Sequence, residues 1–315
     1  MRAARAAPGS RRAPAGACDP PDDPDATQAA LPGAVVGTVL DVSPHVLVIG
    51  HAGGARRLTL TGDATGWRGE PIPPAALRRG EQVVARLLPG RRNVAGKVWA
   101  SIGRVTGTIV SRSAGSLLVD EGPTRPRQTV VISPRAESRI RVRLPQLDPG
   151  SLIDVIGVRH EKVLEAHLPA TAQPAYLAGR VSRAASHARP ATGAISGSAT
   201  WHGTPVADEA LAGVAYPAID PSSGCAEHSV ATPASGVLPY LAVGSLLRVR
   251  NECTGAARVL PVVGCCAMAA HFHDRCLACG TSPRGRIAEL TMASFVALGG
   301  DLERGCFNAT IEPRW

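Results

Sequence analysis

The chain contains Gly285-Arg-Ile-Ala-Glu-Leu-Thr-Met-Ala-Ser-Phe-Val-Ala-Leu-Gly-Gly-Asp-Leu-Glu-Arg-Gly305, about ninety residues after Gly197-Ser-Ala-Thr-Trp-His-Gly203. Thr291 is a favourable helix N-cap, because its side-chain oxygen can accept a hydrogen bond from the first turn. Three apolar residues then recur on one helix face, and Gly299 stands where helices commonly end. This stretch predicts one short helix over residues 292–298.

Two further elements lie between these stretches, Leu241-Ala-Val-Gly-Ser-Leu-Leu-Arg-Val-Arg-Asn251 and Asp274-Arg-Cys276. In this order, the four elements resemble the double-psi β-barrel of rare-lipoprotein-A-like proteins and of the first domain of expansins, over about residues 193–315. The resemblance implies a six-stranded double-psi β-barrel with a short helix. It also implies a secreted or cell-envelope protein that binds cell-wall glycan, either peptidoglycan or a related polysaccharide, without a cofactor.

The same resemblance implies the site residues. Asp274 stands where the family has its catalytic or polysaccharide-contacting aspartate, and Arg275 beside it is a candidate substrate contact. Glu289 is a weaker second acid, and Thr232 is a candidate for the threonine role of expansin-like barrels. Trp201 is either a platform that stacks on a sugar ring or a residue of the barrel core.

Two functions from different classes follow for this barrel. Cleavage of a glycosidic bond needs a proton donor on the leaving oxygen, which a carboxylic acid can supply. The lytic family members have a histidine in an alanine-alanine-histidine element, whereas residues 230–239 contain none. We therefore expect a binding, wall-loosening protein first and a peptidoglycan lytic transglycosylase that uses Asp274 second, so whether the chain is an enzyme stays open. A structural zinc-containing interaction module is a further alternative.

The cysteines are concentrated in this barrel. Cys18 lies near the N-terminus, and seven others fall in the last ninety-one residues. This density predicts disulfides formed in an oxidising compartment, with at least one thiol left over because seven is odd. Zinc is the competing interpretation, because Cys276-x-x-Cys279 has zinc-ligand spacing and His271 and His273 lie close by.

The N-terminal segment does not carry the expected export signal. Residues 1–33 have arginines but no apolar run of signal-peptide length, and they are predicted to be a disordered leader. Ala15-Gly-Ala-Cys18 has the small residues of a lipoprotein cleavage site without the apolar core that such a site requires. Secretion is therefore expected from the barrel and its cysteines alone.

Residues 34–103 and 104–170 are two copies of one unit at an offset of seventy residues. Gly37-Thr-Val-Leu matches Gly107-Thr-Ile-Val, and short runs rich in β-branched residues between Gly and Pro predict strands. The units are similar to small, oligonucleotide-binding-like β-barrel repeats of bacterial secreted proteins, which implies a spacer or adaptor role. Residues 171–192 are expected to be a linker. The other matching pairs are Leu47/Leu117, Thr59/Thr129, Leu77/Leu147 and Gly80/Gly150.

The positive charge belongs to the front of the chain. The net charge is +9, and residues 193–315 carry eight Arg against ten Asp plus Glu, so the first 192 residues carry +11. This half is expected to contact anionic wall polymer or a membrane surface. Nucleic acid is not expected as a partner, because Trp67 and Trp99 are the only aromatic residues of the two repeats.

Overall fold

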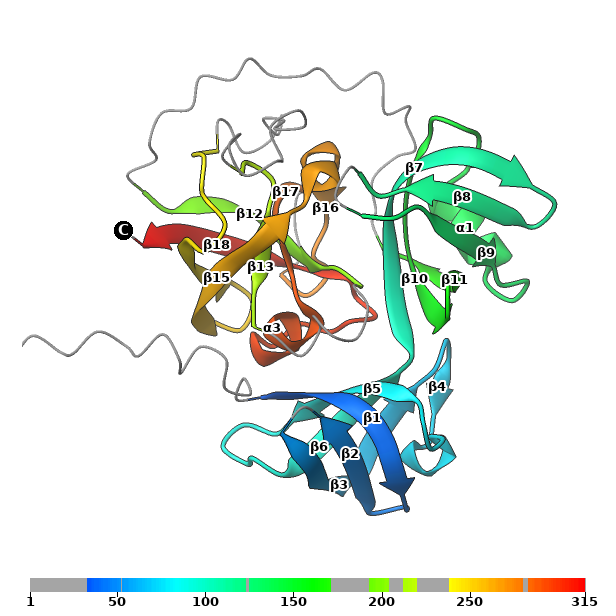
Figure 1. Cartoon of the computed structure of the whole chain (residues 1–315), viewed down its shortest axis with the longest axis vertical. Helices are drawn as coiled ribbons and strands as arrows, with labels where there is room; N and C mark the ends of the chain where they lie inside the picture. Colours follow the sequence, from blue (N-terminus) through cyan, green and yellow to red (C-terminus); the bar gives the residue numbers. More distant parts are fainter. Residues whose placement is uncertain are drawn as a thin grey trace, which may run out of the picture.

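The computed structural model describes residues 33–51, 53–122, 125–170, 193–203, 212–219, 238–279 and 283–314. The predicted leader, the linker and Thr232 lie outside these residues. The chain forms three closed β-barrels, and Figure 1 shows the third beside the second with the first below them. The predicted all-β class is therefore confirmed. None of the helices in the described residues is long and apolar enough to span a membrane.

The first barrel has five strands in the order β2-β1-β5-β6-β3, closed by the β2–β3 pairing. The pair β3/β6 is parallel and the other barrel ladders are antiparallel. Its elements are β1 (Ala34–Val42), β2 (Val46–His51), β3 (Gly54–Trp67), β4 (Pro71–Ile72), the 3-10 helix η2 (Pro74–Ala76), β5 (Gln82–Leu87) and β6 (Val94–Ala100).

The second barrel repeats this topology, which confirms the predicted duplication. Its order is β10-β11-β9-β8-β7, again with one parallel pair, β9/β11, and a helix between the third and fourth strands. This is the strand order of an oligonucleotide-binding-like barrel. Its elements are β7 (Ile102–Ser113), β8 (Ser116–Asp120), β9 (Gln128–Ile132), α1 (Glu137–Arg143), β10 (Leu152–His160) and β11 (Val163–Pro169).

The Gly-Thr signature of each unit has a steric cause. A Cβ atom on Gly37 would overlap the carbonyl oxygen of Gly50 on the neighbouring strand, and one on Gly107 would overlap that of Asp120. These two contacts are themselves seventy residues apart. Glycine is therefore required where the first and second strands of each barrel cross most closely.

The third barrel closes in the order β12-β18-β14-β15-β13-β17, with β17 pairing back to β12. The pairs β12/β17 and β13/β15 are parallel, as in the double-psi barrel that the sequence predicted. Its elements are β12 (Ile195–Trp201), β13 (Val214–Tyr216), β14 (Leu246–Asn251), β15 (Ala257–Cys265), the 3-10 helix η6 (Ala267–His271), β16 (His273–Asp274), β17 (Arg284–Leu290), α3 (Met292–Ala297) and β18 (Cys306–Arg314).

The predicted helix is present as α3. The Thr291 hydroxyl accepts a hydrogen bond from the Ser294 amide at 3.3 Å, and Gly299 follows the helix with φ +83°. The two histidines near the cysteine pair lie on different elements, because His271 ends η6 and His273 belongs to β16.

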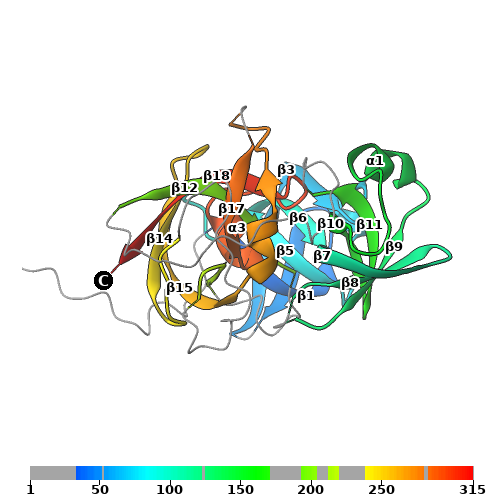
Figure 2. The same ribbon diagram turned by 90° about the horizontal axis from the view of Figure 1, so that it is seen from above.

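The third barrel packs on equivalent positions of both repeats. Figure 2 shows from above the third barrel on one side of the molecule and the second on the other. In the first repeat these positions are apolar: Ala34, Val36 and Val84 join the core of the third barrel, and α3 packs on β1 and β5. In the second repeat, the equivalent positions are Arg104, Thr106 and Asp154, which are also buried. A buried charge network therefore forms at this second interface.

Candidate functional site

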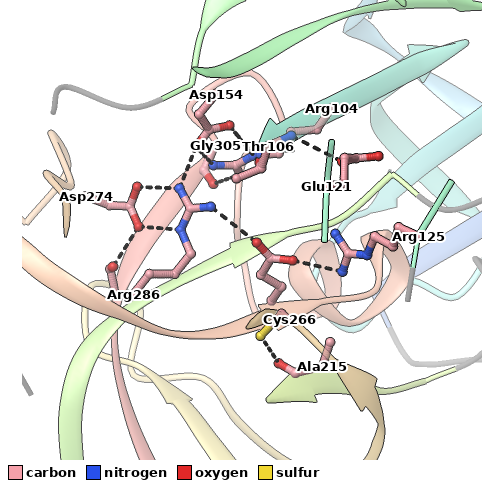
Figure 3. Close-up of polar contacts among 12 residues, drawn as sticks. Arg104, Thr106, Glu121, Arg125, Asp154, Ala215, Cys266, Asp274, Arg286 and Gly305 are labelled. Atoms are coloured by element: carbon pink, nitrogen blue, oxygen red, sulfur yellow. Dashed lines mark hydrogen bonds and ion pairs between the residues drawn. The ribbon is translucent and has the colours of Figure 1, made fainter. Parts of the chain in front are cut away.

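Arg286 on β17 is the centre of this network (Figure 3). Its guanidinium group donates to both carboxylate oxygens of Asp274, over 2.9 and 2.8 Å, and also to Asp154. The group lies 4.6 Å from the centre of the Phe272 ring, which covers it. Ser198 on β12 donates to Asp274 over 2.8 Å. Both oxygens of Asp274 are thus occupied by donors.

The second barrel supplies the other half of the network. Arg104 donates to Asp154 through two nitrogens, over 2.9 and 2.7 Å, and Thr106 donates to the same carboxylate over 3.0 Å. Arg104 also donates to the Gly305 carbonyl of the third barrel over 2.6 Å. Asp154 therefore binds two arginines, one from its own barrel and one from the neighbouring barrel.

A β-bulge brings Glu289 into the same group. Residues three apart in a regular strand face opposite sides, but the register of β17 against β12 shifts between Arg286 and Ala288. Arg286 can therefore donate to Glu289, over 3.2 Å. Arg125 of the second barrel donates to the other oxygen of Glu289 over 2.9 Å.

The network is electrically balanced. Burial would raise the pKa of Asp154 and of Glu289, but the neighbouring guanidinium groups outweigh it and hold both pKa values below their usual range. Burial would likewise lower the pKa of Arg286, and Asp274 and Asp154 reverse the direction. The network thus pairs three arginines with three carboxylates, and buried ions need such matched partners.

Two titratable groups at the edge of the network, Glu121 and His202, have pKa values shifted toward their neutral forms. Burial raises the pKa of Glu121 to about 7, and its carboxylate accepts a hydrogen bond from the Thr106 amide. Burial, with Arg125 adding to it, lowers the pKa of His202 to about 3. Glu121 is therefore protonated in part near neutral pH, and His202 is neutral.

Asp274 and Glu289, the two predicted acids, are thus brought into one cluster. Their side chains are 0% and 2% exposed, and guanidinium groups hold both. A general acid needs a proton to donate and access to the substrate oxygen. Asp274 is 0% exposed and held by a bidentate arginine, so it has no access to a substrate oxygen in this conformation.

Trp201 lies in the core. It is 0% exposed, its indole nitrogen donates to the Leu302 carbonyl over 3.0 Å, and Arg104 lies 5.8 Å from its ring centre. Stacking on a sugar needs an exposed ring face, and this placement offers none. The other of the two interpretations, core packing, fits its position.

Among the predicted catalytic and substrate-binding residues that the structure describes, Arg275 is the one on an open surface. It lines a cleft of about 460 Å³ between α1 of the second barrel and the loop after β16. Arg139, Arg143 and Arg304 line it too, and none of the four forms an ion pair with another described residue. Two exposed apolar side chains, Val142 and Leu277, complete the rim. We call this group the arginine cleft.

The one acidic residue of the arginine cleft is already neutralised. Glu303 forms an ion pair of 2.6 Å with Lys97 and accepts a hydrogen bond from the Trp99 indole, both from the first barrel. The cleft is therefore strongly positive. Two of its arginines come from each of the last two barrels, so the positive surface is not confined to the front half of the chain.

The cysteines only partly follow the prediction. Cys253 and Cys279 form a disulfide, and Cys276 lies beside both. Among the described residues, these three are the group that could hold a metal ion, so Cys276 and Cys279 meet Cys253 rather than His271 and His273. Cys266 and Cys306 are buried thiols, and Cys225 lies outside the described residues.

The central residues Arg104, Asp154 and Arg286 were missed by the sequence reasoning. A signal for two of them existed in the repeat. At an offset of seventy, Arg104 and Asp154 replace the apolar Ala34 and Val84 within an otherwise shared strand pattern. A polar residue at a position that is buried in the sister repeat indicates a buried partner. No comparable signal marks Arg286.

Comparison with known proteins gives no family for this chain. No family model matches it, and no curated protein is significantly similar to it in sequence. The fold and site define a three-barrel β-protein with a charged interface and an arginine cleft. The resemblance to rare-lipoprotein-A-like and expansin barrels remains a prediction.

Proposed function

We propose that this chain binds an anionic glycan of the cell envelope in the arginine cleft and does not cleave it. The observation that carries this proposal is the convergence of four arginines from two barrels on one open cleft whose single acid is paired elsewhere. Guanidinium groups match carboxylate and phosphate geometry, and they are weakly hydrated. Unpaired cations facing a cleft therefore favour a polyanionic ligand.

The cell-envelope part of the proposal is supported by the motifs of the third barrel and by its topology. The non-catalytic part is supported by the buried state of Asp274, which Arg286 and Ser198 hold from both sides. The runner-up, a lytic transglycosylase, would require Asp274 to leave this network and accept a proton. Nucleic acid is a weaker candidate ligand, because no aromatic side chain lines the cleft for base stacking.

The test is retention of the full chain by purified cell-wall sacculi. Arg275→Gln combined with Arg304→Gln should weaken retention about tenfold or more and flatten its salt dependence, since two charge contacts are lost. Arg78→Gln combined with Arg79→Gln is the matched control, because these exposed arginines lie outside the cleft and carry the same charge. Equal losses in both double variants would contradict a specific cleft.

The same incubation separates binding from cleavage. Under the proposal, mass spectrometry of the supernatant finds no released glycan fragments, and Asp274→Asn changes nothing there. Anhydro-sugar fragments released by the wild type and absent with Asp274→Asn would replace the proposal by the lytic transglycosylase.

A further inference from the structure

Three sulfur atoms of the third barrel meet where the turn after β14 touches the loop after β16. Cys253 and Cys279 form the disulfide, with Cα atoms 5.4 Å apart. The Cys276 sulfur lies 3.5 Å from that of Cys253 and 3.6 Å from that of Cys279. Cys276 is 4% exposed and carries a thiol. A third sulfur is therefore in contact with both ends of an existing disulfide.

We propose that Cys253, Cys276 and Cys279 form a thiol–disulfide exchange site with more than one stable pairing. The Cys276 thiol loses its proton to water, and the thiolate attacks the Cys279 sulfur. The Cys276–Cys279 bond forms, the Cys253–Cys279 bond breaks, and Cys253 leaves as a thiolate that takes up a proton. Attack on Cys253 instead releases Cys279. Neither exchange needs an oxidant or a reductant, because the number of disulfides does not change.

The surroundings of the three sulfurs distinguish them from the other buried thiols. Cys253 and Cys279 are only half-buried, so a released thiol lies at the surface. By contrast, Cys266 is fully enclosed, and its thiol donates to the Ala215 carbonyl over 3.2 Å. Burial raises the pKa of Cys266, which leaves it protonated and inert.

The exchange has a consequence for the arginine cleft. Arg275 and Leu277 flank Cys276, and the Cys253–Cys279 bond ties their loop to the turn after β14. The Cys276–Cys279 pairing closes a bond within the loop and removes that tie. This consequence rests on the proposed function of the cleft, whereas the exchange itself does not.

Tryptic mapping of the full chain reads out each pairing. Cleavage after arginine places Cys253 on peptide 251–258 and both Cys276 and Cys279 on peptide 276–284. A Cys253 pairing joins the two peptides, and fragmentation shows which second cysteine carries the alkyl label. The Cys276–Cys279 pairing leaves an internal disulfide in one peptide and an alkylated Cys253 in the other. The protein is equilibrated in a glutathione redox buffer, quenched with acid and alkylated with N-ethylmaleimide.

We expect at least two pairings in the wild type, and their equilibrium should be reached faster as the pH is raised, because the thiolate is the attacking species. Cys276→Ser should leave only the Cys253–Cys279 pairing. Cys266→Ser, which keeps a donor for the Ala215 carbonyl and all three sulfurs, should retain the mixture. The wild-type map decides the matter even if Cys276→Ser fails to fold.

Two results would overturn the proposal. One is a wild type that shows only the Cys253–Cys279 pairing at every pH and incubation time. The other is a chain isolated with all three thiols reduced around one zinc ion, measured by native mass spectrometry, because a metal site would then account for the cluster. The disulfide map is measured on the protein without glycan, so it does not depend on retention by sacculi. Failure of the proposed function and failure of the exchange are therefore distinguishable.

Discussion

Arg286 contacts three carboxylates, and each belongs to a different strand: Asp274 on β16, Asp154 on β10 and Glu289 on its own strand β17. Taking these charges out of water is costly, and their mutual attraction repays the cost only while every partner is present. Such a network does not guarantee a more stable chain than apolar packing would. It does make the loss of any one member expensive.

Asp154→Asn tests whether the loss of one member of the charge network destabilises the chain strongly. The substitution keeps the shape of the side chain but removes the negative charge that Arg104 and Arg286 share. Both buried guanidinium groups then lack part of their charge compensation. We expect a loss of about 3–5 kcal/mol in the free energy of unfolding, measured with urea. The control Glu137→Gln breaks the exposed pair with Arg141 and should cost about 0.5 kcal/mol or less. Similar small losses for both would show that the network is not tightly coupled.

Glu121 and His202 should give opposite pH dependences. The pKa of Glu121 rises from 4.5 to about 7, so between these values the folded chain holds a proton that the unfolded chain has released, and stability falls as pH rises. The pKa of His202 falls from 6.5 to about 3, so the unfolded chain binds the extra proton there, and stability rises with pH. The two effects oppose each other between pH 4.5 and 6.5.

Variants separate these two effects. With Glu121→Gln, the free energy of unfolding should rise between about pH 5 and 6.5, and with His202→Gln it should fall, each by at most about 1.4 kcal/mol per pH unit. Urea unfolding at several pH values measures both slopes. Identical slopes in the two variants would contradict the assignment.

At the level of elements, the two oligonucleotide-binding-like barrels depend on close strand crossings that only glycine permits. The duplicated Gly37 and Gly107 mark these crossings, and the left-handed Gly80 and Gly150 mark a shared turn before the fourth barrel strand. The bulge in β17 is a third local device, because it places Arg286 and Glu289 on one side of the strand. The glycine crossings and turns thus allow the strands to pack, and the bulge places two charged side chains together.

Gly37→Ala should separate steric need from strand propensity. The added methyl group overlaps the Gly50 carbonyl, so we expect a loss of about 2 kcal/mol or more in stability. Gly62→Ala in β3 is the control, because nothing lies within 4 Å of its Cβ position, and it should be neutral within about 1 kcal/mol. Thermal unfolding followed by circular dichroism measures both, and a neutral Gly37→Ala would refute the steric explanation.

At the level of the whole molecule, the third barrel packs on both repeats through one apolar cluster, and it adds a charged network only at the second. The cluster extends from β1 and β5 through α3 into the third barrel and includes Ile156 and Val158 of the second barrel. The charged network adds ionic contacts between the second and third barrels. Lys97 adds two ion pairs with Asp301 and Glu303 across the first interface. These contacts couple the three barrels energetically.

We therefore expect the full chain to unfold in one cooperative transition in scanning calorimetry, which Asp154→Asn shifts as a whole. The reason is that neither interface can open without exposing buried apolar area or unpaired charge. Separate transitions, with Asp154→Asn moving only one, would show that the barrels unfold independently.

The barrel class, the duplication and the short helix followed from local signals. Strand alternation, glycine punctuation and a capping threonine depend on neighbours a few residues away, so they are readable along the chain. The placement of Asp274 and Trp201 depended on distant partners. Asp154 and Arg286 are 132 residues apart in sequence, and Trp201 donates to a carbonyl 101 residues away.

The tertiary structure therefore decides which candidate residues are buried and which are accessible to a ligand. It buried Asp274 and Glu289, which a motif could present only as candidate acids, and it left Arg275 open beside three arginines that no motif had linked. It also chose Cys253 as the partner of Cys279. The physical reason is that charge pairing and burial are set by which strand faces meet across barrel interfaces. Periodicity along one strand carries no information about that meeting.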